Sequence, residues 1–554
     1  PRLDGNSSIH GVTVRNADGN AILEGINLEI PAGSRVAIKS SSQVERSAFA
    51  ELLTREVVPA RGSVTMTGHN LSELHQAVIA ARVGYAHSRP YLFDGTLGDN
   101  LFMPLKTSPK TVLWDPNHRD RFAIEAQKSG NSTDSLKADW LDPELAGLSS
   151  AEEIRGWWFQ LVQAMGIDEV MFRSMLRSRI NPELHQKLAQ EIVGLRDEVQ
   201  ARLKERGVID VVNRFDPDEF NPSIPLGGNL LFAAPKRDIS QKGLAAEREF
   251  LALIIDQGLA EQGIAISQTL IETLHQTFGL DGTSHPLFTA LGIEDDLYEQ
   301  MVDIASRRRE KGDQALSEDE FALLLTVPFA FTAEQIGPAF PESFKAEILQ
   351  IRKIQGAELR DKTSDLFVPI APENYLPRLT LLENALYGRI SSVAGVKGEI
   401  VEDIVAEVLG AHNLRRLVAE TILDISTGLG GSRLATVFQE RAAFSRAGIK
   451  RPDILILDQV LASHDAKTRS DMRGRLQTLL PKTTLIFMED NFDNPDAYDM
   501  LIEIKNGRID GQDELDASEN DGSASDDLRR KLKVISRTEL FAGLDARNQR
   551  LLAF

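Results

Sequence analysis

The period of the hydrophobic pattern changes along the chain and separates strand-rich from helix-rich regions. Apolar and polar residues alternate in His10–Val14 and Ile26–Ile30, which predicts half-buried strands joined by turns. Arg35–Ile38, Ile454–Leu457 and Thr483–Met488 are largely apolar runs, typical of strands buried on both faces of a parallel sheet. Helical patterns follow these runs, so the sequence predicts an α/β fold with an antiparallel part.

A long helical stretch interrupts the strand-rich pattern from Leu105 to about Phe367. Within it, Ser150–Glu153 and Ser317–Glu320 have the spacing of capping boxes that begin helices. Strands return near the end of the chain, where Met500–Ile509 predicts a hairpin with Asn-Gly at its turn. The pattern therefore predicts a sheet-containing core with a large helical insertion.

Composition narrows the class of protein. The net charge is −20, and such an acidic surface repels phosphate backbones, so we expect no nucleic-acid partner. The sequence has no cysteine, which excludes disulfides and thiolate metal sites. The longest apolar stretch, Phe321–Phe331, is too short to span a membrane and contains Pro328. Because the sequence starts at Pro1 and ends at Phe554 within a helical pattern, we interpret it as a fragment.

The residues after the strand Ile454–Leu457 carry the first chemical signal. A carboxylate, Asp458, ends the strand, at the edge where α/β folds bind ligands. The surrounding sequence Arg451–Asp465, RPDILILDQVLASHD, resembles the Walker B strand and D-loop of ATP-binding-cassette (ABC) ATPases. In that family a glutamate that polarises water follows the aspartate. Here Gln459 stands at this general-base position.

The N-terminal strands resemble the start of an ABC cassette, in which a phosphate loop with the pattern G-x-x-x-x-G-K-[ST] follows the strand that ends near Ile38. The resemblance implies that the nucleotide-binding positions are Ser40, Ser41, Ser42, Gln43, Val44, Glu45, Arg46 and Ser47. It further implies that Ser47 and Asp458 are the positions that would hold Mg²⁺.

The chemistry of this loop argues against tight binding of ATP. None of its residues is glycine, although glycine permits the backbone to approach phosphates closely. Glu45 adds a carboxylate where triphosphate charge is expected. At about 5 Å and an effective dielectric near 20, one such repulsion costs roughly 3 kcal/mol, or about a hundredfold in affinity. We expect ATP and Mg²⁺ to bind weakly or not at all.

Residues of three other motifs of the family are also replaced. Ala86–Leu101 resembles the glutamine loop of ABC exporters, with Ser88 in place of the glutamine. Gly428–Arg446 resembles the signature region, but Ala435–Phe438 replaces its Ser-Gly-Gly-Gln. Asp490 stands at the switch-histidine position, where a carboxylate would repel a γ-phosphate.

The resemblance implies a domain order. Residues 1–104 are the first part of the cassette, 105–366 the helical insertion and 367–510 the second part. Residues 511–530 are acidic and predict a solvated linker. Residues 531–554 resemble the helical start of a cyclic-nucleotide-binding domain, although an ordinary amphipathic helix fits equally well.

Three segments are similar to one another: Tyr91–Pro104, Phe220–Ala233 and Tyr375–Gly388. Each opens on an aromatic residue, with Leu at the seventh position and Asn at the tenth. We hypothesise that the insertion is an elaborated helical subdomain built partly by duplication of this segment.

The sequence therefore predicts an ABC-exporter nucleotide-binding domain with lost or greatly reduced hydrolysis, a pseudo-ATPase. It would act at the cytoplasmic face of a membrane as a coupling or regulatory module. Its partners would be a transmembrane domain, outside this fragment or on another chain, and a second cassette as a homo- or heterodimer. Two alternatives are an active ATPase with an atypical site and a soluble scaffold that uses the insertion.

Overall fold

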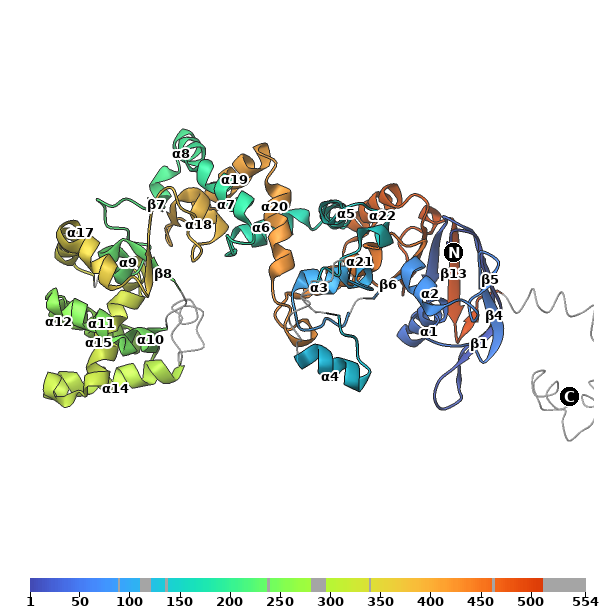
Figure 1. Ribbon diagram of the computed structural model, residues 1–554, viewed down its shortest axis with the longest axis horizontal. Helices are drawn as coiled ribbons and strands as arrows, with labels where there is room; N and C mark the ends of the chain where they lie inside the picture. Colours follow the sequence, from blue (N-terminus) through green and yellow to red (C-terminus); the bar gives the residue numbers. More distant parts are fainter. Residues whose placement is uncertain are drawn as a thin grey trace, which may run out of the picture. The chain divides into compact units, whose positions relative to one another are not determined.

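The computed structural model describes residues 1–87, 90–109, 121–134, 138–236, 240–279, 295–337, 340–460 and 464–511 (Figure 1). The chain forms two compact units. Unit 1 combines residues up to Asp168 with those from Leu423 onward, and unit 2 spans Glu169–Ile422. Ser88, the predicted linker apart from Gly511, and the predicted cyclic-nucleotide-binding segment lie outside the described residues.

Unit 1 contains a six-stranded sheet in the order β14-β13-β3-β12-β11-β6. Its strands are β3 (Arg35–Lys39), β6 (Val83–His87), β11 (Ile454–Asp458), β12 (Thr484–Glu489), β13 (Met500–Lys505) and β14 (Arg508–Ile509). All neighbouring pairs are parallel except β13 and β14, which form a hairpin. Every residue of β11 and β12 is buried, as expected for inner strands covered on both faces.

A second, antiparallel sheet of unit 1 has the order β2-β1-β4-β5. Its strands are β1 (Ser7–Arg15), β2 (Ala21–Ile30), β4 (Arg61–Met66) and β5 (His69–Asn70). Apolar residues from both sheets share one core, in which Phe49 of the first helix is fully buried. The predicted α/β class, a mixed sheet with an antiparallel part, is confirmed.

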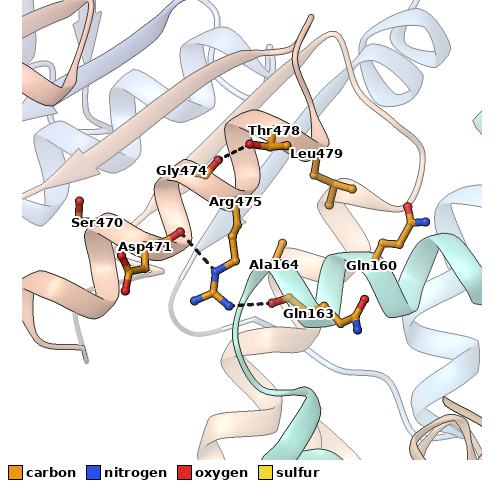
Figure 2. Close-up of a pocket in the computed structure, with 9 residues that line it drawn as sticks. All are labelled: Gln160, Gln163, Ala164, Ser470, Asp471, Gly474, Arg475, Thr478 and Leu479. Atoms are coloured by element: carbon orange, nitrogen blue, oxygen red, sulfur yellow. Dashed lines mark hydrogen bonds between the residues drawn. The ribbon is translucent and has the colours of Figure 1, made fainter. Parts of the chain in front are cut away.

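The helices of unit 1 include α5, which covers residues that were predicted to belong to the insertion. The described helices are α1 (Gln43–Leu53), α2 (Gln76–Arg82), α3 (Leu97–Phe102), α4 (Arg121–Ser129), α5 (Ala151–Ala164), α21 (Thr436–Gly448) and α22 (Ala466–Leu479). Trp157 of α5 donates to the carbonyl of Gly448 at 3.3 Å. Arg475 of α22 donates to the carbonyl of Gln163 at the end of α5, as Figure 2 shows.

Unit 2 is mainly helical. Its elements are α6 (Asp168–Leu176), α7 (Gln186–Gly194), α8 (Arg196–Glu205), β7 (Val212–Arg214), α9 (Leu226–Leu231), β8 (Ala233–Pro235), α10 (Gln241–Ala246), α11 (Arg248–Asp256), α12 (Ala260–Phe278), α14 (Asp295–Lys311), α15 (Glu318–Ala330), α16 (Ala333–Ile336), α17 (Glu342–Lys362), β9 (Phe367–Pro369), α18 (Leu381–Leu386), β10 (Gly388–Ile390), α19 (Val396–Ala411) and α20 (Arg415–Glu420). Two antiparallel strand pairs, β7 with β10 and β8 with β9, join segments that are distant in sequence. A core of its own extends from Leu226 to Phe367.

The compact units divide the chain at other residues than the predicted boundaries of 104/105 and 366/367. Residues 105–168 fall in unit 1, because α5 packs on α21 and α22. Residues 367–422 fall in unit 2, because α18 contacts α7 and α8, and α19 contacts α8. The helical subdomain therefore starts and ends about sixty residues later than the hydrophobic pattern suggested.

The two predicted capping boxes differ in the structure. Ser317 and Glu320 cap each other's backbone reciprocally at the start of α15, as expected. At α5, Ser150 accepts from the amide of Glu153, but the carboxylate of Glu153 accepts from the amide of Ser149 instead. The second half of that box is therefore displaced by one residue.

No single helix of the described ranges is long and apolar enough to cross a membrane. Among the helices that the structure describes, only the pair α11 and α12 together has the required length and composition, and the two bend by 108° at the break between them.

The three similar segments share one local structure. Each contains a six-residue helix, α3, α9 or α18, and each conserves the same hydrogen bonds of the side chain at the tenth position. Asn100, Asn229 and Asn384 each accept from a main-chain amide seven or eight residues earlier, at 2.8 Å. Each side-chain amide also donates back to the carbonyl of that same residue. The shared geometry supports the duplication hypothesis.

Candidate functional site

The segment at the phosphate-loop position connects β3 to α1. Helix α1 begins at Gln43, and Ser42 caps it by accepting from the amide of Glu45 at 3.3 Å. The amide of Arg46 donates to the carbonyl of Ser42. No residue from Lys39 to Ser47 has a positive φ. The backbone here is an ordinary helix start with two of its amides already paired, rather than the open nest that phosphates require.

The carboxylate of Glu45 forms hydrogen bonds both within this segment and with the neighbouring hairpin. It accepts from the hydroxyl of Ser40 at 2.5 Å and from the amide of Gly507 at 2.7 Å. Gly507 lies in the turn of the β13–β14 hairpin, so Glu45 ties the loop to the edge of the sheet. The Ser40 hydroxyl in turn accepts from the amide of Ser42 at 3.1 Å. A negative charge is therefore fixed within the segment where a triphosphate would lie.

A buried ion pair joins the phosphate-loop position to the end of β11. Nε of Arg46 donates to Oδ1 of Asp458 at 3.1 Å, and these residues are 3% and 5% exposed. The Arg46 guanidinium also donates to the carbonyl of Ser40. Burial raises the pKa of the Asp458 carboxyl, and the charge of Arg46 opposes that rise. The two residues expected at the lysine and magnesium positions thus satisfy each other.

The remaining predicted positions differ in burial and in their partners. Ser41, Gln43 and Val44 are exposed, while Ser47 is half-buried and hydrogen-bonds the hydroxyl of Tyr85. Gln459, at the general-base position, has a positive φ of 53° and donates its amide to the carbonyl of Met488.

Asp490, the last predicted position, is exposed directly after β12. The described residues contain no group of three or more histidine, cysteine, aspartate or glutamate side chains that could hold a metal ion.

The region at the signature position also has internal partners. Helix α21 begins at Thr436, and Gln439 donates to the carbonyls of Gly431 and Leu434, both at 2.9 Å. Arg441, 2% exposed, donates to the carbonyl of Val460 and contacts His464. Its side chain therefore holds the segment that follows β11, a role that the resemblance did not assign.

A second buried carboxylate was missed by the sequence reasoning. Glu489 is the last residue of β12 and is 3% exposed, whereas the resemblance assigned a role only to its neighbour Asp490. Burial raises the pKa of Glu489, and the nearby charges of Arg473 and Arg469 oppose the rise. Its carbonyl accepts from the amide of Ser40. The signal was available, because both acidic residues follow the apolar run of β12 directly.

A groove of about 820 Å³ lies between α5 and α22 in unit 1 (Figure 2). Gln160, Gln163 and Ala164 line it from α5, and Asp471 and Arg475 are among the residues that line it from α22. It contains none of the predicted nucleotide positions.

No protein-family model matches the chain. Among curated proteins, it is 27% identical to the transport/processing ATP-binding protein ComA of Streptococcus pneumoniae over 113 residues, which are 20% of this chain and 16% of ComA. It is 35% identical to ABC transporter B family member 2 of Dictyostelium discoideum over 112 residues, which are 20% of this chain and 7% of that protein. The matches thus span less than a fifth of these relatives' lengths.

A solved structure of a bacterial Atm1-family ABC exporter with ATP bound is also similar, with a TM-score of 0.35 and 11% identity, over 94% of this chain and 41% of that chain. At the level of the family, the curated relatives make this chain similar to the ATP-binding components of ABC transporters.

Proposed function

We propose that the chain is the nucleotide-binding domain of an ABC transporter with lost or greatly reduced ATP hydrolysis. It acts as a coupling or regulatory module at the cytoplasmic face of a membrane. Its partner is a transmembrane domain, a second cassette, or both. The similarity to ABC transporter relatives supports the class of protein, and the geometry around Arg46 supports the loss of activity.

The pair of Arg46 and Asp458 is the observation that carries this proposal. In an active cassette, both positions are available to the phosphates and their magnesium ion. Here the cation and the carboxylate are buried against each other at 3.1 Å. Binding of Mg·ATP would have to break the pair and expose both charges to new partners. It would also have to move Glu45, whose carboxylate repels phosphate and is held by Ser40 and Gly507.

Gln459, the residue after Asp458, also removes the general base that ATP hydrolysis needs. A glutamine can hold water through a hydrogen bond, but it cannot accept the proton. Loss of a general base costs about 10²–10⁴ in rate. The main-chain N–H of Gln459 donates to the carbonyl of Met488, and its φ is 53°. Even a bound nucleotide would therefore lack a base at this position.

Exposed apolar side chains in unit 1 support a docking role. Tyr91 and Phe93 are 58% and 46% exposed and pack edge to face, with ring centroids 5.3 Å apart. Leu429, 74% exposed, lies two residues after Thr427, whose hydroxyl donates to the carbonyl of Phe93. Apolar groups gathered on two touching segments are typical of a protein interface. We assign this surface to the membrane domain or to the partner cassette.

Nucleotide binding and phosphate release by the purified chain test the proposal. We expect no saturable binding of ATP at concentrations up to about 1 mM, with or without Mg²⁺, which corresponds to less than roughly 4 kcal/mol of binding free energy. Any phosphate release should be the same in Asp458→Ala. Asp471→Ala, which removes an exposed carboxylate from the same unit, is the matched control.

A phosphate release that falls in Asp458→Ala but not in Asp471→Ala would support the alternative of an active ATPase with an atypical site. The same result would overturn the proposal.

A scaffold role remains a second candidate because unit 2 has a core of its own. On that alternative, the surface of unit 2 captures the partner and the cassette is dispensable. Replacing both Tyr91 and Phe93 by serine distinguishes the two. Loss of membrane-domain capture supports the coupling module, and unchanged capture supports the scaffold.

A further inference from the structure

The second and third similar segments contact each other in unit 2 through matching pairs of strands. The strand before each segment pairs with the strand at the end of the other, so β7 pairs with β10 and β9 pairs with β8. The flanking hydrogen bonds also match. The amide of Phe215 donates to the carbonyl of Tyr387 at 2.9 Å. The equivalent bond, from Ile370 to Phe232, measures 3.0 Å. The two copies are therefore related by an approximate twofold, with one seam between them.

A cavity of about 200 Å³, here called the seam cavity, lies between these two copies. Ile224 and Leu379, which hold the fifth position of their segments, both line it and belong to one apolar cluster. Gly227 of the second segment also lines it, whereas the third segment has Leu382 at the same position. The second segment therefore lacks a large side chain that the third has, which accounts for the space on its side of the seam. A Cβ at Gly227 would meet the ring of Phe250 at 3.5 Å.

Four buried phenylalanines form much of the wall of the seam cavity. They are Phe215, Phe250, Phe329 and Phe367, and each is less than a tenth exposed. The rings of Phe250 and Phe329 meet edge to face with centroids 5.7 Å apart, and Phe250 lies 5.9 Å from Phe367. Such a wall favours a flat aromatic group, because ring edges and faces attract one another at these distances.

Three arginines complete the wall, and each already has partners within the protein. Arg389 pairs with the carboxylate of Glu383 at 2.9 Å and donates to the carbonyl of Ser223. Arg179 and Arg378 also have interaction partners of their own. A charged ligand would lose its hydration here without gaining a free counter-charge, so the cavity selects against charge. Arg179 is exposed, which places the opening to solvent on its side.

We propose that the seam cavity binds a small uncharged aromatic molecule about the size of toluene. An apolar cavity of about 150 Å³ holds benzene, so about 200 Å³ holds a ring with one or two further non-hydrogen atoms. A ligand of this size binds with a dissociation constant on the order of 0.1–1 mM. Because the wall comes from both copies, the ligand binds only where the seam is formed and therefore stabilises unit 2.

Calorimetric titration of the whole chain with toluene tests the site. Benzoate is the charged probe with the same ring, and methylcyclohexane is the saturated probe of similar shape. We expect toluene to saturate one site. Methylcyclohexane should bind about two- to tenfold more weakly, because it lacks the ring contacts. Benzoate should bind at least about tenfold more weakly, because its charge finds no free partner.

Gly227→Leu fills the cavity with the side chain that the third segment has at this position. It should weaken toluene at least about tenfold, because four carbon atoms then occupy the space of the ligand. Gly194→Leu is the matched control: Gly194 is the last residue of α7 in the same unit, is exposed and does not line the cavity. It should bind toluene like the original chain.

Thermal unfolding followed by circular dichroism gives a second measurement. Toluene should raise the melting temperature of unit 2 in the original chain and in Gly194→Leu, but not in Gly227→Leu. Where Gly227→Leu does not fold, Gly227→Ala replaces it and should weaken toluene about fourfold, the equivalent of one buried methylene. The proposal is overturned if toluene does not saturate the chain, if benzoate binds as tightly, or if the folded Gly227 variant keeps the original affinity.

Discussion

Replacing Arg46 by methionine tests whether the loop is held by its ion pair with Asp458. The substitution keeps the length and much of the volume of the side chain but removes its charge and its donors. Asp458 then remains buried without its partner, and the carbonyl of Ser40 loses the guanidinium donor. The prediction concerns unit 1 alone, because both residues belong to it.

The magnitude follows from the distance and the burial. At 3.1 Å and an effective dielectric of about 20, opposite unit charges attract by about 5 kcal/mol. Removing one member of a buried pair destabilises proteins by about 3–5 kcal/mol, because the other charge is left uncompensated. We therefore expect Arg46→Met to lower the free energy of unfolding of unit 1 by about 3–5 kcal/mol at neutral pH. Arg46→Met combined with Asp458→Asn should recover part of this loss.

Urea unfolding followed by tryptophan fluorescence measures the effect in the right unit. All four tryptophans, at positions 114, 140, 157 and 158, precede Asp168 in the sequence, and the three described ones, Trp140, Trp157 and Trp158, belong to unit 1. Arg475→Met is the control, because Arg475 is exposed and donates to main-chain carbonyls. It should cost less than about 1 kcal/mol.

The pH dependence of the difference in unfolding free energy can refute this reasoning. The native pKa of Asp458 is raised by burial, so its ionised form is disfavoured in the folded state. This penalty is absent below the unfolded pKa of about 3.9 and grows as pH rises through the native pKa. Without Arg46 the native pKa rises further, so the difference between Arg46→Met and the original chain should be largest near pH 7 and shrink toward pH 4. A difference below about 1 kcal/mol, or one that does not change with pH, would refute the reasoning.

Three further predictions concern other parts of the chain. Gln459→Glu should not restore phosphate release, because the loop still lacks its nest; release above that of Asp458→Ala would contradict this. Asn384→Ala should lower the free energy of unfolding of unit 2 by about 2–4 kcal/mol, since it leaves the buried amide of Leu376 unpaired, whereas Asn374→Ala, with an exposed side chain, should cost little; urea unfolding followed by circular dichroism measures both, because unit 2 is mainly helical and has no tryptophan. Arg307 lowers the pKa of Glu320 to about 2, so Glu320→Gln should lower the melting temperature at pH 6. The difference in melting temperature from the original chain should shrink as pH falls from about 4.5 toward 2. An equal difference at pH 6 and pH 3 would count against a stabilising ion pair.

The strands of unit 1 could be predicted from sequence because their hydrophobic patterns depend on burial alone. Ile454–Leu457 and Thr483–Met488 became β11 and β12 within one residue at each end. The Asn-Gly hairpin was also predictable, since Asn506 and Gly507 both have a positive φ, which those residue types accept most readily. Local chemistry determines each of these features.

The ends of the helical subdomain could not be predicted, because they depend on which distant helices pack together. The helical pattern of α5 is the same whether it packs on α21 or on a helix of unit 2. Contacts with distant residues assign α5 to unit 1, among them the hydrogen bond from Trp157 to Gly448, 291 residues away. The ion pair of Arg46 with Asp458 spans 412 residues and was equally hidden. Sequence identified both residues as site positions, but it could not show that they neutralise each other.

Each of the two similar segments of unit 2 is bound by an arginine, which the sequence patterns did not predict. Arg196 donates to the carbonyls of Asn374 and Asn384 and lies over the ring of Tyr387. Arg352 donates to the carbonyls of Glu219 and Asn229, at the same positions of its own segment. It lies over the ring of Phe232, which corresponds to Tyr387. Two arginines on unrelated helices thus fasten two copies of one motif in the same way.

These contacts give a physical reason why part of the ABC resemblance survives and part is lost. The asparagine of each similar segment is satisfied mainly by the backbone of its own segment, so its loss would leave buried groups unpaired whether or not a nucleotide binds. Phosphate-loop glycines, a catalytic base and a switch histidine are instead satisfied by the nucleotide and its water. If the chain no longer binds ATP, folding still requires the asparagines, whereas it does not require the loop glycines, the catalytic base or the switch histidine. The replacement of a phosphate-loop glycine by Glu45, which has internal partners, is what that difference predicts.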